Sequence, residues 1–365
     1  MRALILSLFA GFCVNGYCQK DSALYQLLQI NNDTERVNQV YKAGFDLRNT
    51  DPQLAYKYAL AAEQEAQKTN SKKHLAKSYN LKGILHYKKG DYTTALSYQH
   101  KALRLNEADA YAYGVAINQT NLGNIYSDMG YNDLAESSYL QAIKAYNSLN
   151  SRLQIENSLM NLGVLKSKFK RYDIARKYFQ TALAMASEDN NVALMASCNN
   201  NIGSILVEQN QADSALLYLD ESWKLLNIQE NGMEMADVYI NMADAWIRKN
   251  NNGKAKHYLT LADSICKVYD YTDAKVHVYD IYASLFEKQG DYRQANEWLK
   301  KHYRLKDSIL QLSKVESDFA LNEEPPVQAE KQEEHEVPAF KNEWILVILG
   351  AFLIGIPLFL IRYKR

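Results

Sequence analysis

Small residues recur every forty residues through most of this chain, and this periodicity limits the possible folds more than any other feature. One series consists of the alanines Ala55, Ala95, Ala135, Ala175, Ala215, Ala255 and Ala295. A second series lies twelve residues earlier, at Ala43, Gly83, Gly123, Gly163, Gly203, Ala243 and Ala283. A period of this length indicates a stack of similar supersecondary units rather than one globular core.

The residue types at these positions predict that each unit is a helical hairpin. Two helices cross closely only where both have small side chains, and large apolar residues fill the space beside the crossing. Such residues follow the alanines by four positions at Tyr139, Phe179, Leu219, Leu259 and Leu299. Residues that tolerate a left-handed C-cap stand between the helices at Gly90, Gly130, Asn210, Asn250 and Gly290, and Lys170 is the exception. We expect the first unit to be the weakest, because Asp46 replaces an apolar residue and Pro52 breaks the turn.

This pattern resembles the tetratricopeptide repeat (TPR) family over roughly residues 37–313. One unit alone has the matching residues Asn121, Leu122, Gly123, Tyr126, Gly130, Ala135, Tyr139 and Ala142. The commonest TPR period is about 34 residues, and forty resembles the longer variety of kinesin light chains. The resemblance implies an all-α, right-handed superhelical solenoid of about seven units over residues 20–321, with capping helices included.

Both ends of the chain have the features of membrane-directed segments. An apolar run from Ala3 to Val14 follows Arg2, which predicts a signal peptide over residues 1–19 that is cleaved near Cys18 or Gln19. A first helix packed in the core is the alternative, and the residues before Cys18 do not favour lipidation. At the other end, residues 344–361 contain no charge and span about 27 Å as a helix, enough for one transmembrane helix.

The residues around this apolar segment predict its orientation. Residues 362–365 form a basic tail that faces the cytoplasm under the positive-inside rule, which puts the solenoid on the outer face of the membrane. Residues 322–343 contain three prolines and many glutamates, a composition that keeps a chain extended, and we interpret them as a stalk. We therefore expect a single-pass protein of a bacterial cytoplasmic membrane.

No motif in the chain predicts catalysis or a cofactor. The seven histidines are scattered, and metal-ligand, phosphate-loop and nucleophile-elbow spacings are absent. We expect no enzyme activity, no metal and no cofactor. Lys+Arg and Asp+Glu are equal at 42 each, so the sequence offers no basic field for nucleic acid. Cys198 and Cys266 have no cysteine or histidine neighbours and are expected to be buried free thiols rather than a disulfide.

An asparagine series is the strongest candidate for a binding site. It lies two residues before the small anchors of four successive units, at Asn121, Asn161, Asn201 and Asn241. An amide offers a donor and an acceptor together, which suits the backbone of an extended peptide. Asparagine ladders also occur in the grooves of kinesin light chain-type TPR proteins, and the resemblance implies that role for these four residues. The alternative is that the amides bond to neighbouring helices or to each other and stabilise the stacking of the repeats.

Further polar residues are expected on the same face as this asparagine ladder. They are Asn124, Asn157, Asn200, Ser204, Asp244, Lys168 and Arg248. Their mixed charge argues against a dedicated carboxylate clamp. The expected partner is a protein or peptide ligand in the groove, with the membrane contacted through residues 344–361.

Three functions remain open on the sequence. The first is a membrane-anchored interaction scaffold. The second is a sensor or receptor subunit, because Asp21-Ser22-Ala23-Leu24 and Leu305-Lys306-Asp307-Ser308 resemble the borders of TPR ectodomains in bacterial membrane-anchored sensors, whose cytoplasmic output domain would here be a separate chain. The third is a cytosolic tail-anchored adaptor with an uncleaved N-terminus.

Overall fold

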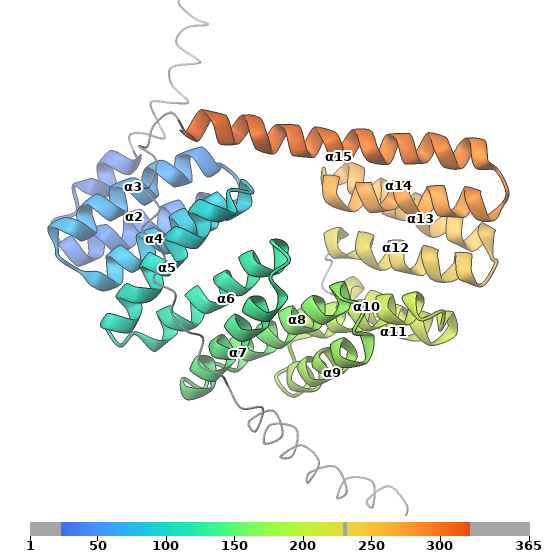
Figure 1. Ribbon diagram of the computed structural model, residues 1–365, viewed down its shortest axis with the longest axis horizontal. Coiled ribbons are helices and arrows are strands. Elements are labelled where there is room, and N and C mark those ends of the chain that lie inside the picture. The colour runs from blue at the N-terminus through green and yellow to red at the C-terminus, as the bar shows by residue number, and fades with distance from the viewer. Residues whose placement is uncertain (1–22, 229–231, 322–365) are drawn as a thin grey trace, which may run out of the picture. The chain divides into compact units, whose positions relative to one another are not determined.

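The computed structural model describes residues 23–228 and 232–321, and this part of the chain is helical without any strand (Figure 1). A short helical segment at residues 23–28 comes first. The helices that follow are α2 (Asp33–Leu47), α3 (Pro52–Lys68), α4 (Lys72–Lys88), α5 (Tyr92–Ala108), α6 (Ala112–Asp128), α7 (Asn132–Ser148), α8 (Arg152–Lys168), α9 (Tyr172–Glu188), α10 (Val192–Glu208), α11 (Ala212–Ile228), α12 (Gly232–Arg248), α13 (Asn252–Val268), α14 (Thr272–Lys288) and α15 (Tyr292–Leu321).

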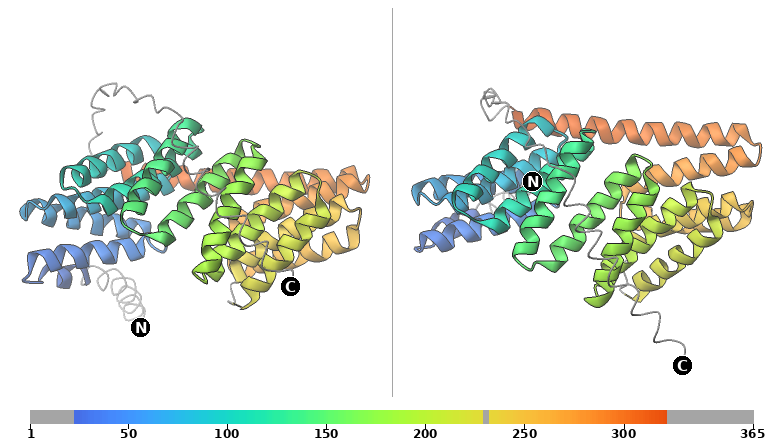
Figure 2. Two further views of the ribbon diagram at one scale, coloured as in Figure 1. Left: turned by 90° about the horizontal axis from the view of Figure 1, so that it is seen from below. Right: turned by 60° about the horizontal axis from the view of Figure 1, so that its bottom comes forward.

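These helices form seven hairpins, each of an even-numbered first helix and an odd-numbered second helix, and the prediction of about seven helical hairpins is confirmed. Helices α3 to α14 each have 17 residues, and from α4 onward each begins twenty residues after the one before. The forty-residue period of the sequence is therefore two equal halves of helix and three-residue turn. Figure 2 shows each hairpin stacked on the next in chain order.

The two small-residue series lie where the helices of a hairpin cross. The alanine series is completely buried from Ala55 to Ala255, and only Ala295 of the last hairpin has slight exposure. A Cβ atom on Gly163 would be 2.4 Å from Cε1 of Phe179 in the facing helix. A Cβ on Gly123 would be 2.6 Å from the Tyr139 ring. Glycine at these sites is therefore required by the ring opposite it, as the packing argument predicted.

In each three-residue turn that the structure describes, the middle residue adopts a left-handed conformation, between hairpins as well as within them. The five predicted positions show it, and Lys170, the exception in the sequence, also has a φ of 55°. The sequence reading missed the turns between hairpins, where the positive φ values are at Asn70, Ala110, Asn150, Asn190 and Asp270. Lys170 is tolerated because the amide of Arg171 donates to the carbonyl of Lys166 at 2.9 Å, as in a glycine-capped helix end.

The first hairpin differs from the others, but not in the way that the sequence predicted. Pro52 does not break the turn: it is the first residue of α3, where its missing N–H is not needed, and the Asp51 side chain caps the helix. The turn before it has four residues, one more than the other described turns. In this hairpin Gly44, rather than Ala43, approaches the second helix, and its Cβ would lie 2.8 Å from Cβ of Tyr58.

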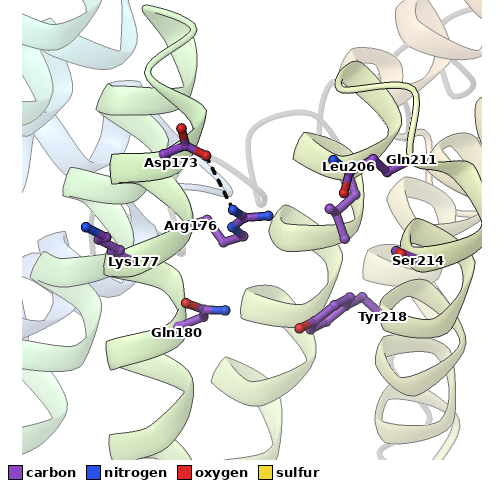
Figure 3. A pocket seen from close by; sticks show the side chains of 8 residues that line it. All are labelled: Asp173, Arg176, Lys177, Gln180, Leu206, Gln211, Ser214 and Tyr218. Carbon is purple, nitrogen blue, oxygen red and sulfur yellow. Dashed lines mark hydrogen bonds and ion pairs between the residues drawn. The ribbon is translucent and has the colours of Figure 1, made fainter.

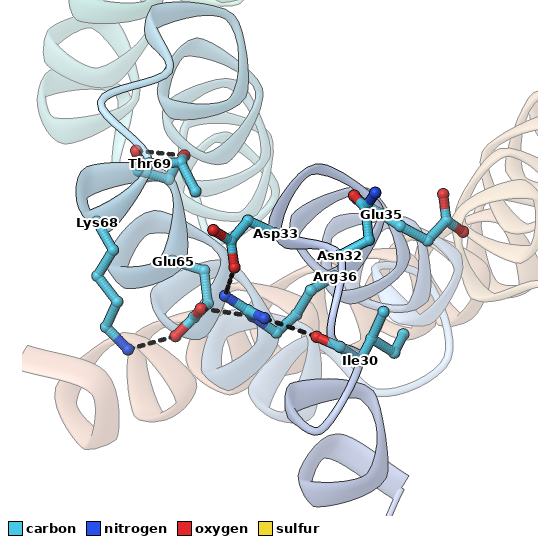
Figure 4. Close-up of polar contacts among 9 residues, drawn as sticks. Ile30, Asn32, Asp33, Glu35, Arg36, Glu65, Lys68 and Thr69 are labelled. Carbon is cyan, nitrogen blue, oxygen red and sulfur yellow. Dashed lines mark hydrogen bonds and ion pairs between the residues drawn. The ribbon is translucent and has the colours of Figure 1, made fainter.

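An ion cluster holds the start of α2 against the end of α3 (Figure 4). Arg36 donates to Glu65 at 2.7 Å and to the Ile30 carbonyl at 2.6 Å, and it also pairs with Asp33. Lys68 reaches Glu65 from the other side. Burial disfavours the charged form of the Glu65 carboxyl, but the hydrogen bonds from Lys68 and Arg36 outweigh it and hold its pKa below the usual value.

The first helices of successive hairpins also contact one another. These contacts join α2 to α4, and in the same way each even-numbered helix to the next as far as α14. The second helices of the described chain do not pack against one another in this way. The first helices therefore share one surface, as predicted for the face that holds the asparagine ladder.

Several sequence predictions fall on residues that the structure does not describe. The signal peptide at 1–19, the stalk at 322–343, the apolar segment at 344–361 and the basic tail at 362–365 all lie outside the described residues. Among the described helices, none combines the length and apolar character needed to cross a bilayer. The membrane segment stays a prediction.

Candidate functional site

A cavity of about 600 Å³ opens on the first-helix surface between α10, α12 and α14. Its lining includes the predicted residues Asn200, Asn201, Ser204, Asn241 and Asp244. On α10 these residues recur at spacings of three and four, which places them on one face of the helix. We call this cavity and its lining the groove site.

The four ladder amides differ in their hydrogen bonds. Asn241 donates from Nδ2 to Oδ1 of Asn200 at 2.8 Å, and so links α12 to α10. Asn201 donates only to the Ser197 carbonyl of its own helix at 2.9 Å. Asn161 makes no hydrogen bond to any residue that the structure describes. Asn241 therefore supports the stacking of the hairpins, as does the fourth amide, Asn121, which donates to the Asn80 side chain of α4. Within the described chain, Asn161 and Asn201 make no hydrogen bond that joins two helices.

The remaining predicted residues lie outside the groove site, and three of them contact neighbouring side chains. Asn124 accepts a hydrogen bond from the Tyr139 hydroxyl at 2.8 Å within its own hairpin. Lys168 pairs with Asp128 of the preceding repeat at 2.8 Å. Arg248 contacts Asp244, whose side chain does line the cavity, at 3.3 Å. Asn157 is exposed on α8.

A buried amide network connects α4, α5 and α6, and sequence reasoning missed it. Asn106 donates to Asn118 at 2.7 Å, and Asn118 donates to Gln99 at 2.8 Å. Gln99 in turn donates to the Asn80 carbonyl at 3.2 Å, and the ladder residue Asn121 bonds the Asn80 side chain at 2.7 Å. The sequence feature that could have predicted this network is Gln99, a polar residue at the repeat position that Tyr139 and Phe179 hold in later hairpins. Gln99 is completely buried. This part of the ladder is thus joined to the core.

Acidic residues of the groove site were also missed. Glu208, Glu234, Asp237 and Asp280 line the cavity, as does His277. Asp237 lies four residues before the ladder residue Asn241, and His277 lies at the equivalent position of the next repeat, forty residues later. The same helical spacing that pointed to the ladder would have found them, because positions i, i+3 and i+4 share a face.

Asp237, a half-buried carboxyl of the groove site, has a shifted pKa. Burial raises the pKa of Asp237, against the opposing effects of nearby His277 and of a hydrogen bond from the Tyr271 hydroxyl at 3.4 Å. The proximity of Glu234 raises it further. A buried carboxyl with this environment gains most from a positively charged neighbour.

A second cavity of about 610 Å³ lies between the second helices α9 and α11 (Figure 3). Arg176, Lys177 and Gln180 of α9 stand on one side, and Ser214 and Tyr218 of α11 stand on the other. Arg176 is paired with Asp173 at 3.3 Å, a neighbour in the same helix turn. The charged side chains of this second cavity belong to one helix, α9, and are largely exposed. The second cavity therefore offers less for the recognition of a ligand than the groove site.

The described residues contain few groups with chemical reactivity. Cys198 and Cys266 are buried free thiols, as predicted. Burial raises the pKa of Cys198 to about 12 and that of Cys266 to about 11, which keeps both protonated and unreactive. Within the described ranges, no group of three or more His, Cys, Asp or Glu side chains has the arrangement of a metal site.

Residues 74–148 and 154–227 match the tetratricopeptide repeat family. These residues form tetratricopeptide repeats. The matched ranges correspond to the four hairpins from α4 to α11. The hairpins on either side of the TPR region keep the same helix–turn–helix form, so the TPR-like solenoid extends through the described chain. No curated protein shows significant sequence similarity to the chain.

Solved structures share this fold at low sequence identity. The apo form of RapI is 16% identical with a TM-score of 0.64, and the match covers 75% of this chain and 99% of that chain. A Rap protein complexed with competence and sporulation factor is 16% identical with a TM-score of 0.62, and the match covers 80% and 81%. The apo quorum sensor NprR from B. thuringiensis is 15% identical with a TM-score of 0.54, and the match covers 82% and 97%.

Proposed function

We propose that this protein is an interaction scaffold that binds an extended peptide segment of a partner protein at the groove site. The observation that carries the proposal is the cavity between α10, α12 and α14, in which amides, hydroxyls and carboxylates surround apolar residues such as Ile281. Ligand sites combine these features, because an apolar floor supplies binding energy and a few polar groups fix orientation.

The amides of the groove site retain hydrogen-bonding capacity for a ligand. Asn201 and Asn241 each use an N–H group within the protein, while their Oδ1 atoms accept no hydrogen bond from a described residue. Each can accept a backbone N–H of an extended peptide, and the second N–H of each amide can donate to a carbonyl. In a Rap protein of the same fold, a complex with the Phr* peptide has been solved, which supports a peptide as the ligand class.

The proposal is tested by filling the cavity. Ser204 lines it, so Ser204→Trp in the full-length chain should abolish binding of a fluorescent pool of short degenerate peptides. The matched control is Ser214→Trp on α11, which lies at the other cavity and should bind as the wild type does. Equal binding by both variants, each shown to be folded by circular dichroism, would place the peptide elsewhere and overturn the proposal.

We also propose that residues 344–361 anchor the solenoid on the outer face of a bacterial cytoplasmic membrane. The support is the uncharged run of eighteen residues, the basic tail after it and the apolar segment near the N-terminus. Protease added outside cells with a permeabilised outer envelope should cut the solenoid. Protection of the solenoid, together with a mature N-terminus at Met1, would instead support the cytosolic tail-anchored alternative.

A second candidate function is a sensor subunit whose output lies on a separate chain. The observation that favours it is the shared fold with NprR, which is described as a quorum sensor. Under this candidate, peptide binding would change an interaction of the membrane segment with a partner. Co-purification of a membrane-bound kinase or regulator that depends on added peptide would support it. Co-purification that is unaffected by peptide would favour the scaffold.

A further inference from the structure

The charge of the groove site is one-sided, although the chain as a whole is balanced. Five carboxylates line the cavity, and no lysine or arginine does. They come from two first helices and the end of a third: Glu208 from α10, Glu234, Asp237 and Asp244 from α12, and Asp280 from α14. A cavity with walls of one charge concentrates ligands of the opposite charge.

Only part of this charge is compensated within the protein. Arg248 lies 3.3 Å from Asp244 and 3.5 Å from Glu208, so these two carboxylates already have a cationic partner. Asp237 has the Tyr271 hydroxyl, which is uncharged. Asp280 is exposed and has no cationic partner other than nearby His277 among the described residues. Asp237 of α12 and Asp280 of α14 therefore have no lysine or arginine partner among the described residues.

The amides add hydrogen-bond acceptors to the same cavity. The Nδ2 groups of Asn201 and Asn241 are each engaged inside the protein, which leaves their Oδ1 atoms without a described donor. Carboxylates accept hydrogen bonds and do not donate them. The cavity thus presents more acceptors than donors, and a guanidinium group, with five N–H donors and no acceptor, is complementary to it.

We infer that the groove site selects peptide segments that carry an arginine side chain, held between Asp237 of α12 and Asp280 of α14. This inference rests on the proposed peptide-binding function and adds its specificity. The asparagine ladder supplies contacts to the backbone, which are the same for any sequence, and the acidic side supplies the preference for one residue type.

The test compares three pools of short degenerate peptides that differ at one central residue. That residue is arginine in the first pool, citrulline in the second and glutamate in the third. Citrulline has nearly the shape of arginine without its charge. The arginine pool should bind the full-length chain about tenfold more tightly than the citrulline pool at low salt, and the difference should shrink as salt screens the charges.

Variants that remove carboxylate charges show which residues give the preference for arginine. Asp237→Asn with Asp280→Asn should remove the preference for arginine, and Asp280→Asn alone, at an exposed position with no packing role, should reduce it about threefold. The matched control is Asp220→Asn, an exposed carboxylate on the second helix α11 that pairs with Lys224. Its preference should equal that of the wild type.

The possible results separate this inference from the function on which it rests. Equal binding of the arginine and citrulline pools would overturn the inference and leave peptide binding intact. An undiminished preference for arginine in both Asp280→Asn alone and Asp237→Asn with Asp280→Asn would also overturn the inference, because the arginine side chain would then bind elsewhere. Failure of all three pools to bind would overturn the proposed function together with the inference.

Discussion

At the scale of single residues, the turns show where the sequence could be read and where it could not. Glycine and asparagine predicted the left-handed turns within hairpins, because these residues adopt that conformation at low cost. Lys170 and Ala110 gave no such signal, yet they adopt the same conformation. The helix stacking on both sides fixes the turn geometry, and a cost of about 1 kcal/mol at one residue is too small to change it.

Ala110→Gly should therefore stabilise the protein. The left-handed φ of 50° strains a residue that has a Cβ atom, and glycine removes that strain, so the free energy of unfolding should rise by about 0.5–1 kcal/mol. Thermal and urea unfolding measure it. The matched change Ala145→Gly, in the interior of α7, should cost about 1 kcal/mol. A lower stability of Ala110→Gly would show that strain at this turn is not released by glycine.

Glu65 predicts a pH dependence of the first hairpin. Its pKa is depressed in the folded state, so its contribution is present above the unfolded pKa and is lost as the pH falls through the folded value, below the usual 4.5. At neutral pH, Glu65→Gln should cost about 1–3 kcal/mol, the range for hydrogen bonds to charged groups.

Melting temperatures between pH 3 and pH 7 test this dependence. The difference between wild type and Glu65→Gln should narrow toward acid. The control Glu35→Gln, at an exposed position in the first turn of α2, should change stability by less than about 0.5 kcal/mol at every pH. A constant difference for Glu65→Gln across this range would exclude a role for its ionisation.

At the scale of helices and hairpins, the sequence was most informative. The two small-residue series predicted which residues of paired helices face each other, because each glycine of the series lies where a large side chain of the facing helix leaves no room for a Cβ. The first hairpin was predicted least well. The structure puts Gly44 rather than Ala43 against the second helix, and nothing in the sequence distinguishes these two neighbours, since both residues are small.

Ala175→Leu tests the assignment of these crossings. Ala175 is completely buried where α9 crosses α8, so three further carbon atoms must displace Phe179 or its neighbours, at a cost of about 1–3 kcal/mol. Because each hairpin is stabilised by the next, amide exchange should accelerate in α7 and α10 as well. The control Ala108→Leu, at an exposed helix end, should melt as the wild type does. An undiminished melting temperature for Ala175→Leu would mean that the crossing lies elsewhere.

At the scale of the whole molecule, the sequence predicted the surface that holds the site but not the contacts made there. The ladder positions follow from the repeat and the helical spacing. The partner of each amide depends instead on how one hairpin is rotated on the next, which has no local signal. Thus Asn121 and Asn241 bond to the preceding first helix, whereas Asn201 bonds within its own. The acidic residues were within reach of the same spacing rule.

These contacts make one double variant decisive for peptide binding by the ladder. Asn161→Ala with Asn201→Ala removes no hydrogen bond between helices, so the melting temperature should stay close to that of the wild type. Two lost contacts to a peptide backbone should weaken the affinity for the degenerate peptide pool by about 1–3 kcal/mol, or roughly five- to two-hundred-fold. The matched variant Asn121→Ala with Asn241→Ala should lose thermal stability, because it breaks two bonds between hairpins.

The affinity of the Asn161→Ala, Asn201→Ala protein for the peptide pool, measured alongside its melting temperature, is the most direct test of a peptide-binding groove on the first helices. We expect a weakened affinity in a protein that melts as the wild type does. An unchanged affinity would contradict the role of the asparagine ladder in binding, and a lowered melting temperature with unchanged affinity would assign these amides to the stacking of the repeats.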